Sequence, residues 1–358
     1  MAEPFKELFS QKFVQDLAAA VKSTDKTFKT EAFVSHVLDD DWPDRELKQR
    51  MRHITESLHQ FLPPDFRQAL HILTSVSAKF NGLSHMVFAD FVEHYGLDYF
   101  EESVQALELF TQNSSSEFAV RPFIIKYPTK MMQHMMKWAN SKNEHIRRLA
   151  SEGCRSRLPW AMALPQFKKD PAPVIKILEI LKNDSSEYVR KSVANNLNDI
   201  SKDNPETVLK IAGKWLGKSK ETDWIVKHGC RTLLREGNTN ALLLFGFQKP
   251  ANIHVDKLKV TPKIRMGETI TFSFLLSTKE AMLGRLRLEY IVDFMKANGK
   301  TAPKIFKISE GDFTVKEREI VKNHSFRPIT TRKYYAGKHG LRIVVNGKVM
   351  RESEFLVV

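Results

Sequence analysis

The chain contains very little cysteine. Cys154 and Cys230 are the only two cysteines among its 358 residues. Two thiols cannot build a disulfide framework or a four-ligand zinc site, and neither His134 nor His145 lies near a cysteine pattern. We interpret both cysteines as small core side chains on helices, because a free cysteine is usually buried. The sequence therefore predicts no metal site, and no cofactor is expected.

Long apolar runs are also missing. No run reaches the roughly eighteen apolar residues that a membrane-spanning helix needs. The first residues, MAEPFKELFSQKF, contain no apolar stretch before a cleavage site, so we expect no signal peptide. These two absences favour a cytoplasmic protein without a membrane partner.

Positive charge, in contrast, is in excess. The formal net charge is +14 and the isoelectric point is about 9.6. The charge is spread along the chain, which argues against a flexible basic arm. It indicates nucleic acid or another anionic surface as partner. With 358 residues, of which 42% are hydrophobic, the chain can bury a large core and form two domains.

The first part of the chain has the periodicity of helices. Apolar side chains such as Phe13, Leu17 and Val21 recur at four-residue spacing. Pro63-Pro64 and Asn81-Gly82 are expected to interrupt these helices. Residues 1–112 show paired helices without a clean repeat and without a catalytic motif. We expect them to cap and extend the repeats that follow.

Residues 144–160, EHIRRLASEGCRSRLPW, carry the most informative pattern. Apolar residues at three- and four-residue spacing define one helix face, and Arg148, Glu152 and Arg155 share the opposite face. The helix is expected to end at the proline that precedes Trp160. Taken alone, this stretch also fits a solvated helix face with one ion pair.

The same pattern recurs in residues 187–200, EYVRKSVANNLNDI, and 223–236, DWIVKHGCRTLLRE. Helical repeats of about 40 residues are typical of solenoids, in which equivalent faces form one surface. A row of Arg148, Lys191 and His228 is what a surface that follows a polyanion needs. Each repeat is predicted to be a helix pair whose first helix starts near a proline, namely Pro128, Pro173 and Pro205.

A shorter relative of these repeats precedes them in residues 114–123, SSSEFAVRPF. Arg121 follows an apolar residue, as the arginines of the later repeats do. The serines are interpreted as a helix N-cap with Glu117 in the first turn.

From residue 251 onward the pattern changes from helices to strands. Turn signals are Met266-Gly267, Asn298-Gly299, Glu310-Gly311 and the strong hairpin signal Asn346-Gly347. Short strands over about a hundred residues favour an immunoglobulin-like β-sandwich over a barrel. The expected strands are residues 258–260, 269–276, 286–295, 304–308, 314–321, 339–345 and 349–357. Basic residues in this part fit either phosphate contacts or ordinary strand faces: Lys257, Lys259, Lys263, Arg265, Arg327, Arg332, Lys333 and Lys338.

Three motifs, SSSEFAVRPF, HIRRLASEGCRSRLPW and VRKSVANNLNDISKDNP, resemble the AlkC family. These are bacterial DNA glycosylases of the HEAT-like-repeat alkylpurine superfamily, and the likeness spans nearly the whole chain. The fold class that follows is mainly α, with a HEAT-like solenoid in residues 1–250 and an immunoglobulin-like β-sandwich in residues 251–358. The resemblance implies a concave surface that wraps alkylated duplex DNA. It also implies a monofunctional glycosylase that excises 3-methyladenine and 3-methylcytosine for base excision repair, and we expect a monomer.

The resemblance also implies roles for single residues. Glu117 and Asp199 look like the catalytic carboxylates, and Trp160 and Phe118 are expected beside the lesion. Without the resemblance, Glu117 is an acid at a helix start, Asp199 is part of a polar turn, and Trp160 is a half-buried packing residue. The expected DNA-binding set is Arg121, Arg148, Glu152, Arg155, Arg157, Lys191, Asn195 and His228.

The implied chemistry is consistent with these residue types. An N3-methylated base is a cation and therefore leaves without a strong general acid. Two carboxylates stabilise an oxocarbenium-like sugar and position a water, while an indole face attracts the cationic base. Two alternatives stay open: a non-catalytic basic scaffold that binds damaged DNA or a protein, and a protein that binds damage without cutting. Release of free methylated base distinguishes the enzyme from both.

Overall fold

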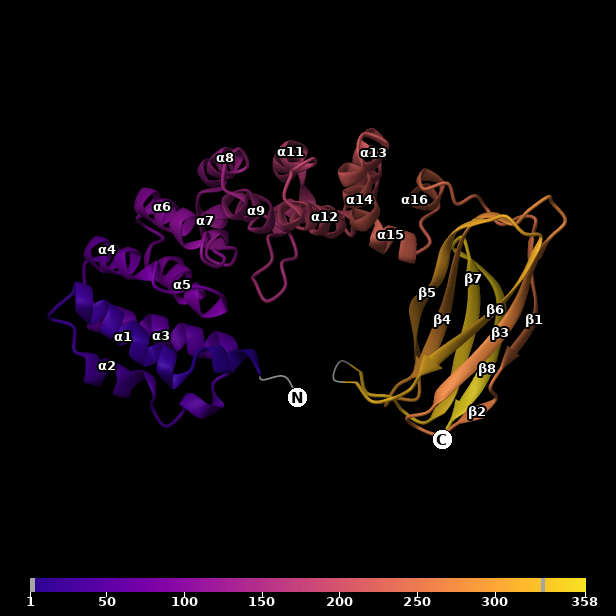
Figure 1. The fold of residues 1–358 in the computed structure, drawn as a ribbon, viewed down its shortest axis with the longest axis horizontal. Coiled ribbons are helices and arrows are strands. Elements are labelled where there is room, and N and C mark those ends of the chain that lie inside the picture. The colour runs from indigo at the N-terminus through magenta and orange to yellow at the C-terminus, as the bar shows by residue number, and fades with distance from the viewer. Residues whose placement is uncertain (1–3, 330–331) are drawn as a thin grey trace. The chain divides into compact units, whose positions relative to one another are not determined.

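The computed structural model describes residues 4–329 and 332–358, and it divides into two compact units. The first unit runs up to Asn204 and includes Trp215–Gly229, and the second consists of Pro205–Lys214 and Cys230–Val358. Helices come first and strands follow, so the predicted mainly α fold with a C-terminal immunoglobulin-like part is confirmed (Figure 1). Residues 230–250 group with the strands, whereas the sequence placed them in the helical domain.

The N-terminal part is helical, as its periodicity predicted. Ser10 caps its first α-helix by accepting a bond from the N–H of Phe13 at 3.1 Å, and Asp65 caps α4 by accepting from Gln68 at 2.9 Å. Pro63-Pro64 separates α3 from α4, as expected. None of the helices in the described part of the chain is long and apolar enough to cross a membrane. The elements are η1 (Phe5–Leu8), α1 (Gln11–Thr24), α2 (Thr30–Val37), η2 (Trp42–Asp44), α3 (Leu47–Phe61), α4 (Phe66–Ser77), η3 (Leu83–His85), α5 (Met86–Tyr95) and α6 (Phe100–Phe110).

The repeats form helix pairs. Helix α8 packs on α9 and α11 packs on α12, while α9, α12 and α14 pack on one another in that order (Figure 1). Pro128 and Pro173 lie in the first turns of α8 and α11, as predicted. The helices are α7 (Val120–Lys126), α8 (Pro128–Trp138), α9 (Glu144–Glu152), α10 (Pro165–Lys169), α11 (Ala172–Leu181), α12 (Glu187–Ser201), α13 (Pro205–Trp215) and α14 (Lys220–Gly229).

The arginine that recurs near the start of α9 and of α12 has a structural role. Arg147 donates to the carbonyls of residues 141–142 at 3.0 Å, and Arg190 donates to those of residues 184–185 at 2.8 Å. Arg147 also pairs with the Asp184 carboxylate through two bonds of 2.6 and 2.9 Å. These arginines therefore satisfy the carbonyls of the turn that precedes their own helix, which explains why they repeat in the sequence.

Helix α9 ends at Glu152, not at the later proline that the sequence suggested. A longer helix would use the Gly153 carbonyl internally, but Arg121 donates to the carbonyls of Gly153 and Arg155, at 2.9 Å each. A Cβ on Gly153 would also lie 2.6 Å from a side chain of α7. Consequently Arg155 lies in a loop and Cys154 in a turn, both outside the helix where they were expected, although Cys154 is buried as predicted.

Glu117 precedes α7 and does not lie in its first turn, which corrects the capping interpretation. Helix α7 begins at Val120, and the residue before it, Ala119, makes no side-chain cap bond. Ser115 instead accepts a bond from the N–H of Glu117 at 3.3 Å and donates its hydroxyl to the Glu117 carboxylate at 2.7 Å. The serine therefore orients the carboxylate.

The second unit contains the helices α15 (Arg231–Arg235) and α16 (Thr239–Leu244) and two β-sheets (Figure 1). Sheet order is β1-β3-β6 in one and β2-β8-β7-β4-β5 in the other. Phe272, Phe274, Leu288 and Ile343 are among the buried residues of its core, as in a β-sandwich. The strands are β1 (Ile253–Val260), β2 (Lys263–Ile264), β3 (Thr269–Thr278), β4 (Gly284–Met295), β5 (Thr301–Phe313), β6 (Glu317–Ser325), β7 (Gly337–Val345) and β8 (Lys348–Val357).

Every predicted strand overlaps an observed one, with two differences in detail. The hairpin signal is confirmed, because Asn346 and Gly347 have φ values of 44° and 78°, as the tight turn requires. The turn predicted at Glu310-Gly311 is wrong, since Gly311 lies inside β5 and pairs with Leu286 of β4. Strand β2 was not predicted, because its two residues are too short to show a period.

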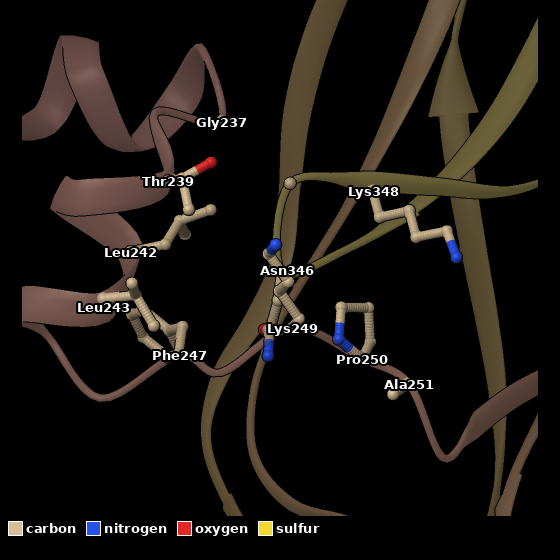
Figure 2. A pocket seen from close by; sticks show the side chains of 11 residues that line it. Gly237, Thr239, Leu242, Leu243, Phe247, Lys249, Pro250, Ala251, Asn346 and Lys348 are labelled. Atoms are coloured by element: carbon tan, nitrogen blue, oxygen red, sulfur yellow. The ribbon is translucent and has the colours of Figure 1, made fainter.

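A pocket of about 400 Å³ lies in the second unit between α16 and the β7–β8 hairpin (Figure 2). Leu242 and Phe247 line its helical side, and Asn346 lies at the hairpin (Figure 2). The Asn346 side chain accepts a bond from the N–H of Arg287 and donates to the carbonyl of Gln248, both at 2.7 Å. The turn residue therefore fastens the segment before β1 to the sheet.

A buried histidine predicts how the first unit responds to acid. His85 is fully buried between Phe88 and Phe110, and burial lowers its pKa from 6.5 to about 4. The native state therefore needs neutral imidazole. The contribution of His85 to the free energy of unfolding is fully present above pH 6.5. It is lost as the pH falls toward 4, and the total loss is roughly 3 kcal/mol.

We expect His85→Phe to remove that acid-side loss. All five tryptophans lie in the first unit, so denaturant unfolding followed by tryptophan fluorescence at pH 7 and pH 5 reports on it. The wild-type chain should lose more stability between these pH values than the variant does. Equal losses would show that His85 does not control the response.

Candidate active site

A cavity of about 370 Å³ lies in the first unit. Its lining residues come from the residue after η1, from α3, η3, α5 and the turn before α7, and from α9, the loop after it, and α12. The apolar lining is Phe9, Leu47, Met51, Leu83, Met86, Leu158 and Pro159. The polar and aromatic lining is Lys48, Ser115, Glu117, Phe118, Arg148, Glu152, Arg155, Trp160 and Tyr188. Much of the site residue set expected from the sequence therefore meets at one cavity, joined by N-terminal residues to which the sequence gave no functional part.

The Glu117 carboxylate is held at this cavity by two donors. It forms a short ion pair with Arg148 Nη1, and it accepts the Ser115 hydroxyl at 2.7 Å. Arg148 Nη1 also donates to Ser115 Oγ at 2.8 Å, so the three side chains form a closed triangle. The side chains of Glu117 and Arg148 are 15% and 14% exposed, which leaves the carboxylate accessible from the cavity.

Asp199 is linked to Glu117 through a chain of ion pairs. Glu152 Oε1 lies 3.5 Å from Arg148 Nη2 and 2.6 Å from Arg155 Nη1, and Arg155 Nε donates to Asp199 Oδ2 at 2.8 Å. Lys202 contacts the other Asp199 oxygen at 3.2 Å. The two predicted carboxylates thus belong to one network. Asp199 is not among the residues that line the cavity, and the side chains of Arg148, Glu152 and Arg155 link it to Glu117.

Charges in this network are balanced by partners, which lets it stay buried. Burial lowers the pKa of Arg148, but attraction to Glu152 and Glu117 outweighs it and raises the pKa above its ordinary value. The same balance, with Glu152 and Asp199 as partners, raises the pKa of Arg155. Both guanidinium groups therefore stay charged. The ring of Tyr188 lies 5.0 Å from the Arg148 guanidinium, and burial raises the pKa of its hydroxyl.

Trp160 does not have the environment of a packing residue. Its side chain is 64% exposed, and its φ of +62° lies in the left-handed region. That conformation costs about 1–3 kcal/mol for a residue with a side chain and is concentrated at functional sites. The loop around it is held by few backbone bonds, such as Leu164 N–H to Ser156 O at 3.2 Å. The interpretation as a half-buried packing tryptophan is therefore wrong.

Arg121 cannot contact DNA in this fold, which corrects the prediction for this residue. Its side chain is fully buried and donates to the carbonyls of Met162 at 2.7 Å and of Gly153 and Arg155 at 2.9 Å. Burial lowers its pKa to about 10, so it is still charged at neutral pH. Arg121 is a structural residue that shapes the loop leading to Trp160.

Four further predicted DNA-binding residues are not among the residues that line the cavity, namely Arg157, Lys191, Asn195 and His228. Arg157 pairs with Asp203 through bonds of 3.0 and 2.6 Å. Lys191 is exposed and pairs with Glu187 at 2.7 Å, one turn earlier on α12. His228 stacks on Trp224 with ring centroids 5.0 Å apart, and Asn195 is half-buried on α12. The helices that carry Arg148, Lys191 and His228 pack in order, while their contact with DNA stays a prediction.

Sequence reasoning missed two kinds of lining residue. Tyr188 directly precedes the apolar-arginine pair of its repeat, and His145 has the same position in the previous repeat. The centroids of the two rings are 5.7 Å apart. That equivalence was visible in the alignment of the repeats. Nothing in the sequence indicates that Lys48 and Met51 of α3 line the cavity, because their spacing does not show that α3 lies near the loop after α9. In residues 4–329 and 332–358, no group of His, Cys, Asp and Glu side chains is arranged to hold a metal ion.

The fold and this cavity define a class: a helical-repeat protein with a carboxylate and an exposed tryptophan at one site, followed by an immunoglobulin-like domain. Two family profiles match: "DNA alkylation repair enzyme" over residues 83–233 and "Uncharacterised protein YhaZ, C-terminal Ig-like domain" over residues 254–358. The chain belongs to the AlkC-type family of DNA alkylation repair enzymes, which confirms the resemblance seen in its motifs.

Two relatives match along their whole length. The uncharacterized protein YhaZ of Bacillus subtilis (strain 168) is 45% identical over 354 residues, which is 98% of this chain and 99% of that protein. The alkylpurine DNA glycosylase AlkC of Pseudomonas fluorescens, solved bound to DNA containing an abasic site analogue, is 36% identical with a TM-score of 0.94. That match covers 99% of this chain and 100% of AlkC.

Proposed function

We propose that this protein is a monofunctional DNA glycosylase that hydrolyses the N-glycosidic bond of 3-methyladenine and 3-methylcytosine in duplex DNA. The observation that carries the proposal is the accessible Glu117 carboxylate at a cavity that also holds the exposed Trp160. Similarity to AlkC, an alkylpurine DNA glycosylase bound to abasic-site DNA, supports both the reaction and the DNA partner.

The reaction needs stabilised positive charge and a water. As the cationic base leaves with the bonding electron pair, it becomes neutral and the sugar becomes an oxocarbenium-like cation. Glu117 lies next to the cavity and supplies the negative charge that this cation needs. A water that attacks the sugar carbon gives up its proton to a carboxylate, and the indole of Trp160 attracts the methylated base, by about 0.5–2 kcal/mol.

DNA phosphates would change the ion pairs around the two carboxylates. In the free protein Arg148 holds Glu117, while Arg155 and Lys202 hold Asp199. A phosphate that accepts bonds from Arg148 or Lys202 competes for these cations, because both are charged donors. When a cation turns toward DNA, the negative charge of its carboxylate is less neutralised and stabilises the cationic sugar more strongly. We propose that Asp199 enters the reaction in this way.

The experiment that tests the function is analysis of free bases released from methylated duplex DNA. We expect 3-methyladenine and 3-methylcytosine to appear with time, and abasic sites to accumulate without strand cleavage. A protein that only binds damage, or a basic scaffold, would retard the DNA and release no base. Absence of both bases at enzyme excess would refute the proposal.

Lys191 tests the row of basic residues along the repeats. Lys191→Ala removes an exposed charge that pairs with Glu187 on the same helix. If Lys191 neutralises one phosphate, the slope of log affinity against log salt should fall in magnitude by about 0.9. Fluorescence anisotropy with undamaged duplex over a series of salt concentrations measures that slope.

The control is Lys137→Ala, the same charge change at an exposed position of α8, in the other helix layer (Figure 1). It should leave the slope unchanged. An equal slope for Lys191→Ala and the wild type would show that Lys191 does not contact a phosphate.

A further inference from the structure

Lys48 of α3 bridges the two aromatic residues expected beside the lesion. Its ammonium donates to the backbone carbonyl of Trp160 at 2.9 Å and lies 4.8 Å from the centroid of the Phe118 ring. All three residues line the cavity. Lys48 is 112 residues away from Trp160 in the chain, so the contact depends on the fold of the whole first unit.

A contact at the Trp160 carbonyl acts directly on the backbone conformation of this residue. The residue is left-handed at φ +62°, and its exposed indole gains little from packing, so its conformation must be stabilised by its backbone neighbours. A bond from an ammonium to a carbonyl is charge-assisted and stronger than a bond between neutral groups. Lys48 therefore stabilises the strained residue directly at its peptide group.

Lys48 differs from the arginines of the cavity in how its charge is balanced. Arg148 and Arg155 each pair with two carboxylates. Lys48 forms no salt bridge with any residue in the described ranges, so its contacts are the Trp160 carbonyl and the Phe118 ring. Its charge also acts on the half-buried Glu93 carboxylate, but its hydrogen bond and its ring contact are made to the two groups whose placement the site requires.

We propose that Lys48 is a positioning residue that fixes Trp160 in its left-handed conformation and holds the Phe118 ring at the cavity. This inference rests on the proposed glycosylase function for its effect on rate, whereas its effect on Trp160 itself does not. It gives the N-terminal helices a direct part in the site. A phosphate contact by Lys48 would instead act on DNA affinity, and the test separates the two.

The test compares Lys48→Met, which keeps the length and loses the ammonium, with Lys48→Arg, which keeps a charged donor. With enzyme in saturating excess, Lys48→Met should lower the single-turnover rate of base release about tenfold, because the indole is no longer held. The enzyme concentration for half-maximal rate and the salt slope for undamaged duplex should not change. Lys48→Arg should restore most of the rate. Lys12→Met, on α1 with Asp16 as its partner, is the control of equal charge change.

A second readout follows Trp160 without any reaction. Subtracting the signal of the matching Trp160→Phe protein isolates its fluorescence from that of the other four tryptophans. In Lys48→Met, the anisotropy decay of Trp160 should show larger local motion than in the wild type or in Lys12→Met. Unchanged motion would overturn the inference, whether or not the protein releases bases. A loss confined to affinity and salt slope would also overturn it, in favour of a phosphate contact.

Discussion

Glu117→Gln is expected to lower the single-turnover rate of base release by about 10²–10³-fold, as loss of a preorganised charge-stabilising group does. Glutamine keeps the size of the side chain and an oxygen that can accept from Ser115 and Arg148. It loses the negative charge that we propose stabilises the oxocarbenium-like sugar. DNA affinity should stay close to that of the wild type, because Glu117 is an anion beside a polyanion and contributes no attraction.

Asp199→Asn should cause a loss of similar size. The amide oxygen can still accept from Arg155 Nε, now 2.8 Å from the carboxylate, so the loop after α9 keeps its support. The control is Asp203→Asn, which removes a nearby acid that pairs with the more exposed Arg157. It should leave the rate almost unchanged.

Measurements on methylated duplex at enzyme excess separate the outcomes. Near wild-type rates for Glu117→Gln would remove this residue from the chemistry, and the same result for Asp199→Asn would leave that residue a purely structural role. If Asp203→Asn were as slow as Asp199→Asn, the effect would come from the charge of the region and not from one carboxylate.

Much of the fold was predictable because its signals are local. Helix period, prolines at the starts of α8 and α11, and the Asn346-Gly347 turn each depend on a few neighbouring residues. Two of the errors come from contacts between distant residues. Helix α9 stops early because Arg121 takes its next carbonyls, and Gly311 stays in β5 because it pairs with β4. Neither partner can be recognised from spacing along the chain.

The sequence named several residues that the structure brings to one cavity, but their geometry was predictable only in part, and their roles stay predictions. The resemblance named Glu117, Trp160 and Asp199, and the structure brings the first two to one cavity. It could not show that Glu152 joins Arg148 to Arg155, since that bridge needs the loop after α9. A motif also could not distinguish Arg148, which lines the cavity, from Arg121, which is buried, because in the sequence each is an arginine next to an apolar residue.

Arg121→Met is expected to destabilise the first unit by about 3–5 kcal/mol, because each buried acceptor that loses its donor costs roughly 1–3 kcal/mol. Methionine fills the volume, but the carbonyls of Met162, Gly153 and Arg155 lose their buried donor. Denaturant unfolding followed by tryptophan fluorescence measures the change, because all five tryptophans belong to this unit.

The size of this loss decides between a structural and a DNA-binding arginine. Arg121→Lys keeps the charge and one donor group, so its free energy of unfolding should fall between those of the wild type and Arg121→Met. If the methionine variant does not fold, the lysine variant is compared with the wild type instead. Lys191→Ala, an exposed change, should leave the unfolding midpoint almost unaltered. If Arg121→Met had wild-type stability and weakened DNA binding, the result would support the prediction that Arg121 contacts DNA. The buried position of its guanidinium argues for the opposite, because a side chain with no exposed surface cannot reach a phosphate unless the loop that carries Trp160 opens.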